Sequence, residues 1–411
     1  MGLRIGNHAR SRVKPESAPA PGGPASLAAV LLVTFLGSVS GGVFWTGIFF
    51  VTLRHYSFSE TENLGLALGM GALYALVAYE ASALYAFFRV TPRTVLGLSL
   101  VAWGVAAALP VLRPDAAWPL WAGALAGSAA SGLVWPVVES YLGARRHGED
   151  LRRTIGWFNV VWTLATALPL LVMPLLTRAH VLSPLLLCGA VNLVALVALA
   201  ALPAAPPRSE ADAAASAVGA EYPLLLRSAS VLLPLGYLMS STLSPVLPHR
   251  LAAAGPGLVP ESVLAATWMV ARWLTLAAMA RLSFWHGRWG ALLAAGASLT
   301  GGLAVVLLSS SVPGIVLGLL LFGTGMGLTY CVTLYYSLSV GHGAVDAGGG
   351  FEALVGLGYV IGPLVGLAGQ SVATGERASL VTVLLTLACA AAGAVLAVRP
   401  YRAAVRARSR G

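Results

Sequence analysis

Long apolar stretches separated by short polar segments run along the whole chain. A helix needs about 20 apolar residues to cross the hydrocarbon core of a bilayer. The stretches lack the alternating polar positions of a membrane barrel, so helices are the only way to satisfy their backbone groups in lipid. The pattern predicts twelve transmembrane helices, at 27–53, 63–88, 95–112, 118–143, 155–177, 181–203, 224–248, 261–282, 289–309, 312–339, 348–370 and 379–398. We therefore expect an all-α polytopic membrane protein.

Composition excludes a soluble fold. Hydrophobic residues make up 58% of the 411 residues and charged residues only 10%, whereas about 25% are charged in typical soluble domains. The three cysteines, Cys188, Cys331 and Cys389, lie inside apolar stretches without the spacing of a disulfide framework or a metal site. We expect them to pack between helices.

The predicted helices fall into two groups of six. Residues 204–222 between the groups are rich in Ala, Pro and Ser and too polar to cross a membrane. We expect them to form a cytoplasmic linker between an N-terminal bundle at 27–203 and a C-terminal bundle at 223–398. Basic tails are expected at 1–26 and 399–411.

Basic residues predict the orientation. Most of the 25 Lys and Arg residues fall on one side of the membrane if both termini are cytoplasmic, and only Arg54, Arg113, Arg178, Arg250 and Arg377 fall on the other side. The first apolar stretch is longer than the about 7–15 residues of a signal-peptide core, so we expect it to be retained as a helix. The net charge of +10 then reflects topology and contacts with anionic lipid, not nucleic-acid binding.

The two groups of helices are related in sequence. Arg93 corresponds to Arg288 and Trp135 to Tyr330, in each case about 195 residues apart, and Pro169 corresponds to Pro363 at nearly the same offset. A near-constant offset across several helices indicates duplication of a six-helix unit.

Twelve helices, a central linker, cytoplasmic ends and related halves resemble the major facilitator superfamily over about residues 27–398. That family has a Gly-x-x-x-Asp-Arg-x-Gly-Arg-Arg loop after its second helix. Residues 83–93 have arginines there but neither the Asp nor the Gly, and the second copy at 280–288 keeps Gly287-Arg288 without the Asp. The ion pair that this Asp makes in the family therefore lacks its acid here.

The eleventh predicted helix resembles the glycine motif that the family's proton antiporters carry on the fifth. Gly349, Gly358, Gly362, Pro363 and Gly366 match it, and the final Gly of the motif is replaced by Leu367. Small residues at this spacing permit close helix approach, and the proline bends the helix. A packing ridge is the favoured interpretation, and no direction of transport follows from the motif.

Four ionisable residues lie within predicted spans, where each is a candidate functional group. Arg272 is near the middle of the eighth span, where it binds either an anionic solute or a buried glutamate such as Glu80, with Trp268 one turn away for a cation–π contact. Glu80 has apolar neighbours and suits proton coupling, with an ion pair to a loop arginine as the alternative.

Two further glutamates lie nearer the ends of their predicted spans. Glu139 is close to a cytoplasmic end, where pairing with Arg152 or Arg153 is the favoured role. Glu352 is expected to begin the eleventh helix, where the helix dipole favours a carboxylate. Asn159 occupies the position in the first half that corresponds to Glu352. We group Glu80, Glu139, Glu352 and Asn159 as candidates for proton coupling or gating.

The resemblance implies that the first, fourth, seventh and tenth helices line a central cavity. Each carries a stripe of aromatic and hydroxyl side chains. With Arg272 added, the candidate cavity residues are Trp45, Ser131, Trp135, Tyr237, Ser241, Tyr330 and Thr333. Aromatic planes with a few hydroxyls suit a small organic molecule. The alternative is that these side chains pack or hydrogen-bond within the helices.

These observations favour a secondary active transporter that moves a small organic solute by alternating access. The sequence has no Gly-x4-Gly-Lys-Ser/Thr motif and its one lysine is Lys14, so an ion gradient, with protons favoured, would supply the energy. An aromatic lining poor in amides favours amphipathic or drug-like solutes. An anion or sugar facilitator and a receptor or scaffold of the same fold are the alternatives.

A membrane enzyme is disfavoured, because no cluster of catalytic residues occupies a loop at the membrane surface. We expect no cofactor and no catalytic residues. The expected partners are a small-molecule solute, the lipid bilayer and protons, and the expected state is a monomer in the cell membrane.

The orientation can be tested with single cysteines. Ala215→Cys should react with an impermeant maleimide only from the cytoplasm, and Ser57→Cys only from outside, because the positive-inside bias places them on opposite faces. Labelling of intact cells, with and without permeabilisation, measures this. Labelling of Ala215→Cys in intact cells would reverse the orientation.

Overall fold

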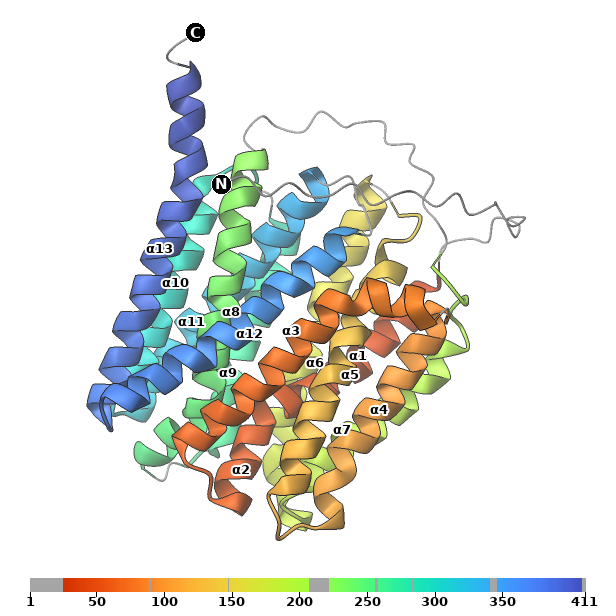
Figure 1. Ribbon diagram of the computed structural model, residues 1–411. Coiled ribbons are helices and arrows are strands. Elements are labelled where there is room, and N and C mark those ends of the chain that lie inside the picture. Colours follow the sequence, from red (N-terminus) through yellow and green to blue (C-terminus); the bar gives the residue numbers. More distant parts are fainter. Residues whose placement is uncertain are drawn as a thin grey trace.

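The computed structural model describes residues 25–88, 90–146, 148–206, 222–255, 258–282, 284–340 and 346–408. Every regular element in this part of the chain is helical (Figure 1). The elements are α1 (Leu27–Gly42), η1 (Val43–Gly47), α2 (Ile48–Tyr56), α3 (Glu60–Phe88), α4 (Pro92–Leu112), α5 (Trp118–Gly143), α6 (Gly148–Ala179), α7 (Ser183–Leu199), α8 (Tyr222–Ala253), α9 (Glu261–Arg281), α10 (Trp289–Leu308), α11 (Val312–Val340), α12 (Asp346–Val372) and α13 (Glu376–Arg408).

All twelve predicted spans lie on helices. The first span is α1, η1 and α2 in sequence, which run as one helical segment with a π-helical turn in its middle. Among the described residues, eleven helices are long and apolar enough to cross a membrane, and α7 is a shorter apolar helix. The prediction of an all-α, multi-pass membrane protein is confirmed.

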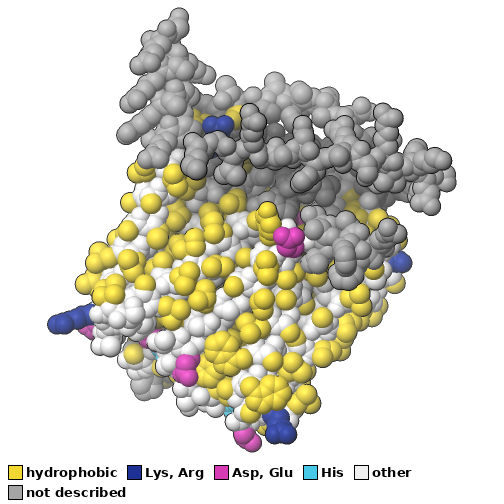
Figure 2. All heavy atoms as spheres, viewed as in Figure 1, with side chains coloured by type: hydrophobic (Ala, Val, Ile, Leu, Met, Phe, Trp, Pro, Cys, Tyr) yellow, Lys and Arg dark blue, Asp and Glu magenta, His cyan; other side chains and the backbone are white. Residues whose placement is uncertain are grey.

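The surface is apolar where a soluble protein would be polar. Leu76, Val105, Leu175, Val197 and Leu293 are each more than half exposed. Apolar side chains cover the middle of the face shown in Figure 2, whereas the charged side chains visible there lie toward its ends. A contiguous apolar surface of this kind faces lipid rather than water.

Helices of the two halves of the chain occupy opposite sides of the molecule (Figure 1). The first half, α1 to α7, meets the second half, α8 to α13, mainly where α3 packs along α12 and α6 packs along α9. Glycines permit the first of these contacts, since a Cβ on Gly71 would overlap the backbone of Tyr359, and one on Gly356 would overlap Ala75. The two pairs of helices form the seam between the halves.

The glycine ridge of α12 packs against two neighbours. A Cβ on Gly358 or Gly362 would overlap the backbone of α8 at Pro234 or Leu238, and one on Gly366 would collide with Leu64 of α3. Pro363 lies inside the helix. The packing interpretation of this motif is therefore confirmed by geometry.

Parts of the predicted domain layout lie outside the described residues. These include residues 1–24 and most of the 204–222 linker. At the other end, α13 continues to Arg408, so residues 399–408 of the predicted tail extend the last helix.

Substitution of Gly362 by Ala should destabilise the protein, because its methyl group would meet both the Leu238 carbonyl and the Ser241 hydroxyl on α8. We expect a loss of about 1–3 kcal/mol, as for overpacked cores, seen as a lower thermal unfolding midpoint in detergent. Gly301→Ala on α10 is the matched control, since nothing lies within 4 Å of the place that its added methyl group would occupy. An equal fall in both variants would contradict close packing at Gly362.

Candidate functional site

A cavity of about 120 Å³ lies between the two halves. Its walls come from α1, η1, α2, α3, α5 and α6 of the first half and from α8, α9, α11 and α12 of the second. Aromatic and charged side chains dominate the lining: Trp45, Tyr74, Trp135, Glu139, Trp162, Tyr237, Trp268, Arg272, Tyr330, Glu352 and Tyr359. A lining that combines aromatic planes with convergent polar groups is typical of sites for small organic molecules.

The π-helical turn η1 carries Trp45 into this cavity. Single π-turns within α-helices are often found at functional sites. The indole of Trp45 stacks on Tyr359 of α12, with ring centroids 4.5 Å apart and planes 5° from parallel. Tyr74 of α3 meets both rings edge-on, at 5.4 and 5.5 Å. These three rings form one wall that spans the seam.

Two carboxyl groups from opposite halves meet in the cavity. Glu139 of α5 and Glu352 of α12 are within hydrogen-bonding contact of each other, and the Tyr74 hydroxyl donates to Glu352. An ionised carboxylate only accepts hydrogen bonds, so a hydrogen bond between two carboxyl groups requires a proton on one of them. The pair is therefore arranged to hold a proton.

Arg272 of α9 lies between two indoles. Its guanidinium carbon is 4.4 Å from the ring centre of Trp162 on α6 and 4.9 Å from that of Trp268 on its own helix. Its Nη2 donates to the Thr166 hydroxyl at 3.2 Å. Only 4% of the residue is exposed, and none of the ion pairs found among the described residues includes it.

Most of the predicted cavity residues line the cavity. These are Trp45, Trp135, Tyr237, Ser241, Tyr330 and Arg272, together with the gating candidates Glu139 and Glu352. The cation–π contact predicted between Trp268 and Arg272 is also present.

Two residues that were predicted to line the cavity instead direct their hydroxyl groups to helix carbonyls. The Ser131 hydroxyl donates to the Ser128 carbonyl at 2.9 Å. The Thr333 hydroxyl contacts the carbonyls of Thr329 and Ala229, at 2.8 and 3.2 Å. For these two, the alternative interpretation of hydroxyls bonded within and between helices is correct.

The predicted surroundings of three ionisable residues were wrong. Glu80 is exposed near the end of the α3 span, beside the exposed Leu76 and Tyr79, and is not a partner of Arg272. Glu139 meets Glu352, and none of the ion pairs among the described residues joins it to a loop arginine; the side chain of Arg152 lies outside the described residues. Glu352 does not begin its helix, because α12 starts at Asp346 and the carboxyl group lies nearly two turns further on.

Asn159 does not line the cavity but contacts a residue that does. Its side-chain oxygen accepts a hydrogen bond from the Trp162 indole at 3.2 Å, and it is not among the lining residues. It holds the indole that covers Arg272, so its contact is with the aromatic wall rather than with the carboxyl pair.

Sequence reasoning missed Tyr74, Trp162 and Tyr359. The resemblance assigned the cavity to the first, fourth, seventh and tenth helices, whereas these residues lie on the second, fifth and eleventh. A signal was available for Tyr359, which follows Gly358 within the glycine ridge.

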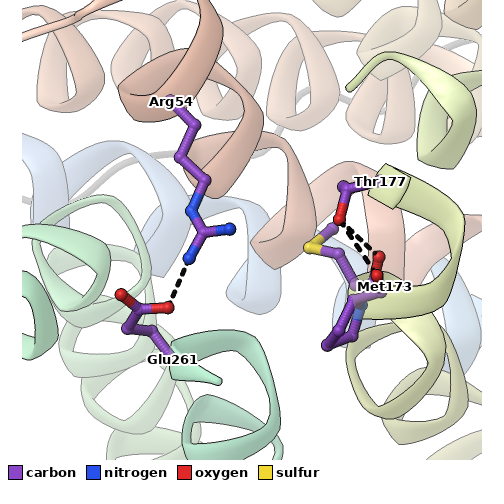
Figure 3. Close-up of polar contacts among 5 residues, drawn as sticks. Arg54, Met173, Thr177 and Glu261 are labelled. Atoms are coloured by element: carbon purple, nitrogen blue, oxygen red, sulfur yellow. Dashed lines mark hydrogen bonds and ion pairs between the residues drawn. The ribbon is translucent and has the colours of Figure 1, made fainter. Parts of the chain in front are cut away.

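Polar contacts join the halves where α2 turns into α3. Arg54 at the end of α2 points toward Glu261 at the start of α9 and forms an ion pair with it (Figure 3). Nearby, Gln370 of α12 donates to Glu60 of α3, and the Asn63 amide lies 3.1 Å from His249 of α8. These contacts close the seam at that end of the molecule.

The chain is similar in structure to the nucleoside transporter NupG, with a TM-score of 0.66 and 12% sequence identity over 90% of this chain and 99% of NupG. A structure described for substrate recognition in proton dependent oligopeptide transporters aligns with a TM-score of 0.66 and 11% identity, over 91% and 96% of the two chains. The human organic anion transporter MFSD10 aligns at 0.59 and 16%, over 91% and 97%. No protein-family model and no curated protein sequence matches the chain.

The cavity can be tested with paired tryptophan substitutions on α5. Trp135→Ala should reduce the thermal stabilisation that small aromatic compounds give the purified protein, because it removes a lining ring. Trp118→Ala, which removes a 65% exposed ring on the same helix, should leave that stabilisation unchanged. Equal losses in the two α5 variants would mean that Trp135 only packs.

Proposed function

We propose that this chain, which has the fold of the major facilitator superfamily, is a secondary transporter that carries a small organic solute across the cell membrane by alternating access. The observation that supports this most is the cavity between the two halves, with ionisable groups from both halves in its walls. Sites near the interface of two repeated bundles suit transport, because rocking of the bundles exposes the site to each side in turn. The three structural neighbours are all described as transporters.

The contacts that close one end of the seam suit a reversible gate. Arg54 and Glu261 are partly exposed, at 49% and 32%, and exposed ion pairs contribute only about 0–1 kcal/mol. Such contacts hold the halves together without locking them. In the predicted orientation this end is extracellular, so the structure corresponds to a state closed to the outside.

Proton coupling is the favoured energy source. The Glu139–Glu352 pair crosses the seam, with one carboxyl group on α5 and the other on α12. A proton shared by the pair stabilises the halves in contact, and separation of the halves would expose each carboxyl group to a new environment. Release or uptake of the proton is thereby linked to the movement of the bundles.

The aromatic walls favour amphipathic or drug-like solutes over sugars, because the described lining residues include no carboxamide, a group that commonly recognises sugars. A sugar or anion facilitator would share the cavity but would not need the carboxyl pair. A receptor or scaffold of the same fold would bind solute without flux. Proteoliposomes separate these alternatives.

Substitution of Glu352 by Gln should uncouple transport from protons, because the amide cannot exchange a proton. In proteoliposomes with trapped pyranine, addition of transported compounds should acidify or alkalinise the lumen for the wild type but not for Glu352→Gln. Exchange of labelled compound down its own gradient should persist in the variant.

The matched control is Glu80→Gln, which removes an exposed carboxyl group outside the cavity and should keep wild-type proton movement. If Glu352→Gln still moves protons with solute, the pair is not the coupling site. If no compound moves in the wild type, the transporter proposal itself fails.

A further inference from the structure

Arg272 is a buried cation without an acidic partner among the described residues. The groups that surround it are two indoles, the Thr166 hydroxyl and, within electrostatic range, the tyrosines Tyr237, Tyr330 and Tyr359. Burial of a charge is costly unless it is paired and fully hydrogen-bonded. Aromatic faces and one hydroxyl only partly replace the water that the guanidinium has lost.

Two hydrogen-bond donors at this place are unused. The Nε of Arg272 and the Nε1 of Trp268 are both buried and have no acceptor in the part of the chain that the structure describes. The two residues are one helical turn apart on α9 and both line the cavity. A positive charge with free donors beside it is the chemistry that receives an oxyanion.

The room beside Arg272 limits the size of the ligand. The cavity measures about 120 Å³, and an engineered cavity of about 150 Å³ holds one benzene molecule. Indole and phenol rings line it, and they favour a flat apolar body through offset and edge contacts. The cavity is therefore of the order of one ring in size, and its walls favour an aromatic body with one short charged substituent.

We propose that the solute is a small aromatic anion whose carboxylate binds Arg272, with its ring held among the aromatic side chains of the cavity. This inference names the substrate class of the transport site and rests on the proposed function. A preference for monoanions is expected because the cavity offers one unpaired cation.

Binding of the anion should be accompanied by binding of a proton to the carboxyl pair. The titratable and charged groups of the cavity are Arg272 of α9, Glu139 of α5, Glu352 and Tyr359 of α12, Tyr74 of α3, Tyr237 of α8 and Tyr330 of α11. With one proton on the pair, the positive charge of Arg272 balances the remaining carboxylate. A bound anion leaves an excess negative charge, which favours a second proton on the pair.

Tyr237 and Tyr330 lie within electrostatic range of Arg272 and of both glutamates, so the two ends of the cavity are close enough to couple. Because binding linkage is reciprocal, the anion and the proton each favour binding of the other. The anion and a proton therefore move together in the same direction.

The first test uses three probes that share a ring: benzoate, benzamide and benzylamine. Purified full-length protein in detergent should be stabilised against heat by benzoate, with an apparent affinity at least about 30-fold higher than for neutral benzamide, as expected when a buried charge pair is lost. Benzylamine, which is a cation at neutral pH, should not compete. Equal or stronger stabilisation by benzamide or benzylamine would overturn the proposal.

Variants then assign the effect to Arg272. Arg272→Gln should abolish the preference for benzoate over benzamide, whereas Arg272→Lys should keep the preference with lower affinity, because lysine retains the charge but not the planar group between two indoles. Arg250→Gln is the control, since Arg250 binds the Ser309 carbonyl outside the cavity. The lysine variant and the wild-type probe series decide the question even if the glutamine variant does not fold. Unchanged benzoate preference in a folded Arg272→Gln would also overturn the proposal.

Failure of this inference and failure of transport give different results. Benzoate-driven acidification of pyranine-loaded proteoliposomes that exceeds the acidification of protein-free liposomes, which benzoic acid enters unaided, supports both. Flux of benzamide or benzylamine without flux or binding of benzoate leaves transport standing and removes the anion site. Selective binding of benzoate with no flux of any probe keeps the anion site and removes the transporter proposal.

Discussion

Burial of charge between the two halves is the constraint on which the arrangement of the cavity depends. Arg272, Glu139 and Glu352 all lie inside a protein whose outer surface faces lipid. A charged group that is removed from water there depends for its stability on the neighbours that the packing provides. The indoles around Arg272 and the shared hydrogen bond of the carboxyl pair are those neighbours.

Close helix packing brings these neighbours to the buried charged groups. Gly71 and Gly356 bring α3 and α12 together, and Gly358 and Gly362 bring α12 onto α8. Their lack of side chains leaves no bulk in the contact, so the rings of the neighbouring positions turn toward the cavity. Tyr359, one residue from Gly358, stacks on Trp45. The same small residues thus fix the seam and build the aromatic wall.

Hydropathy alone predicted the helices, because each span must satisfy its backbone within lipid. It could not predict which face of a helix turns inward, since each residue rotates the face by about 100°. Ser131 and Trp135 are one turn apart on α5, yet only the Trp135 ring lines the cavity. The Ser131 hydroxyl donates a hydrogen bond to a carbonyl of its own helix. The apolar neighbours of Glu80 likewise did not show whether it is buried, because such neighbours can belong to a lipid-facing surface as well as to an interior.

The contact between Glu139 and Glu352 was beyond sequence reasoning for a different reason. The residues are on helices of opposite halves, far apart in the chain, and each has an ordinary local role that a sequence favours: an ion pair for one, a helix start for the other. Only the crossing of α5 and α12 brings them together. Because that crossing lies in the seam, the pair exists only while the halves are in contact there. In the proposed mechanism, a proton held by the pair would report the relative position of the halves, which coupling of an ion to a moving site requires.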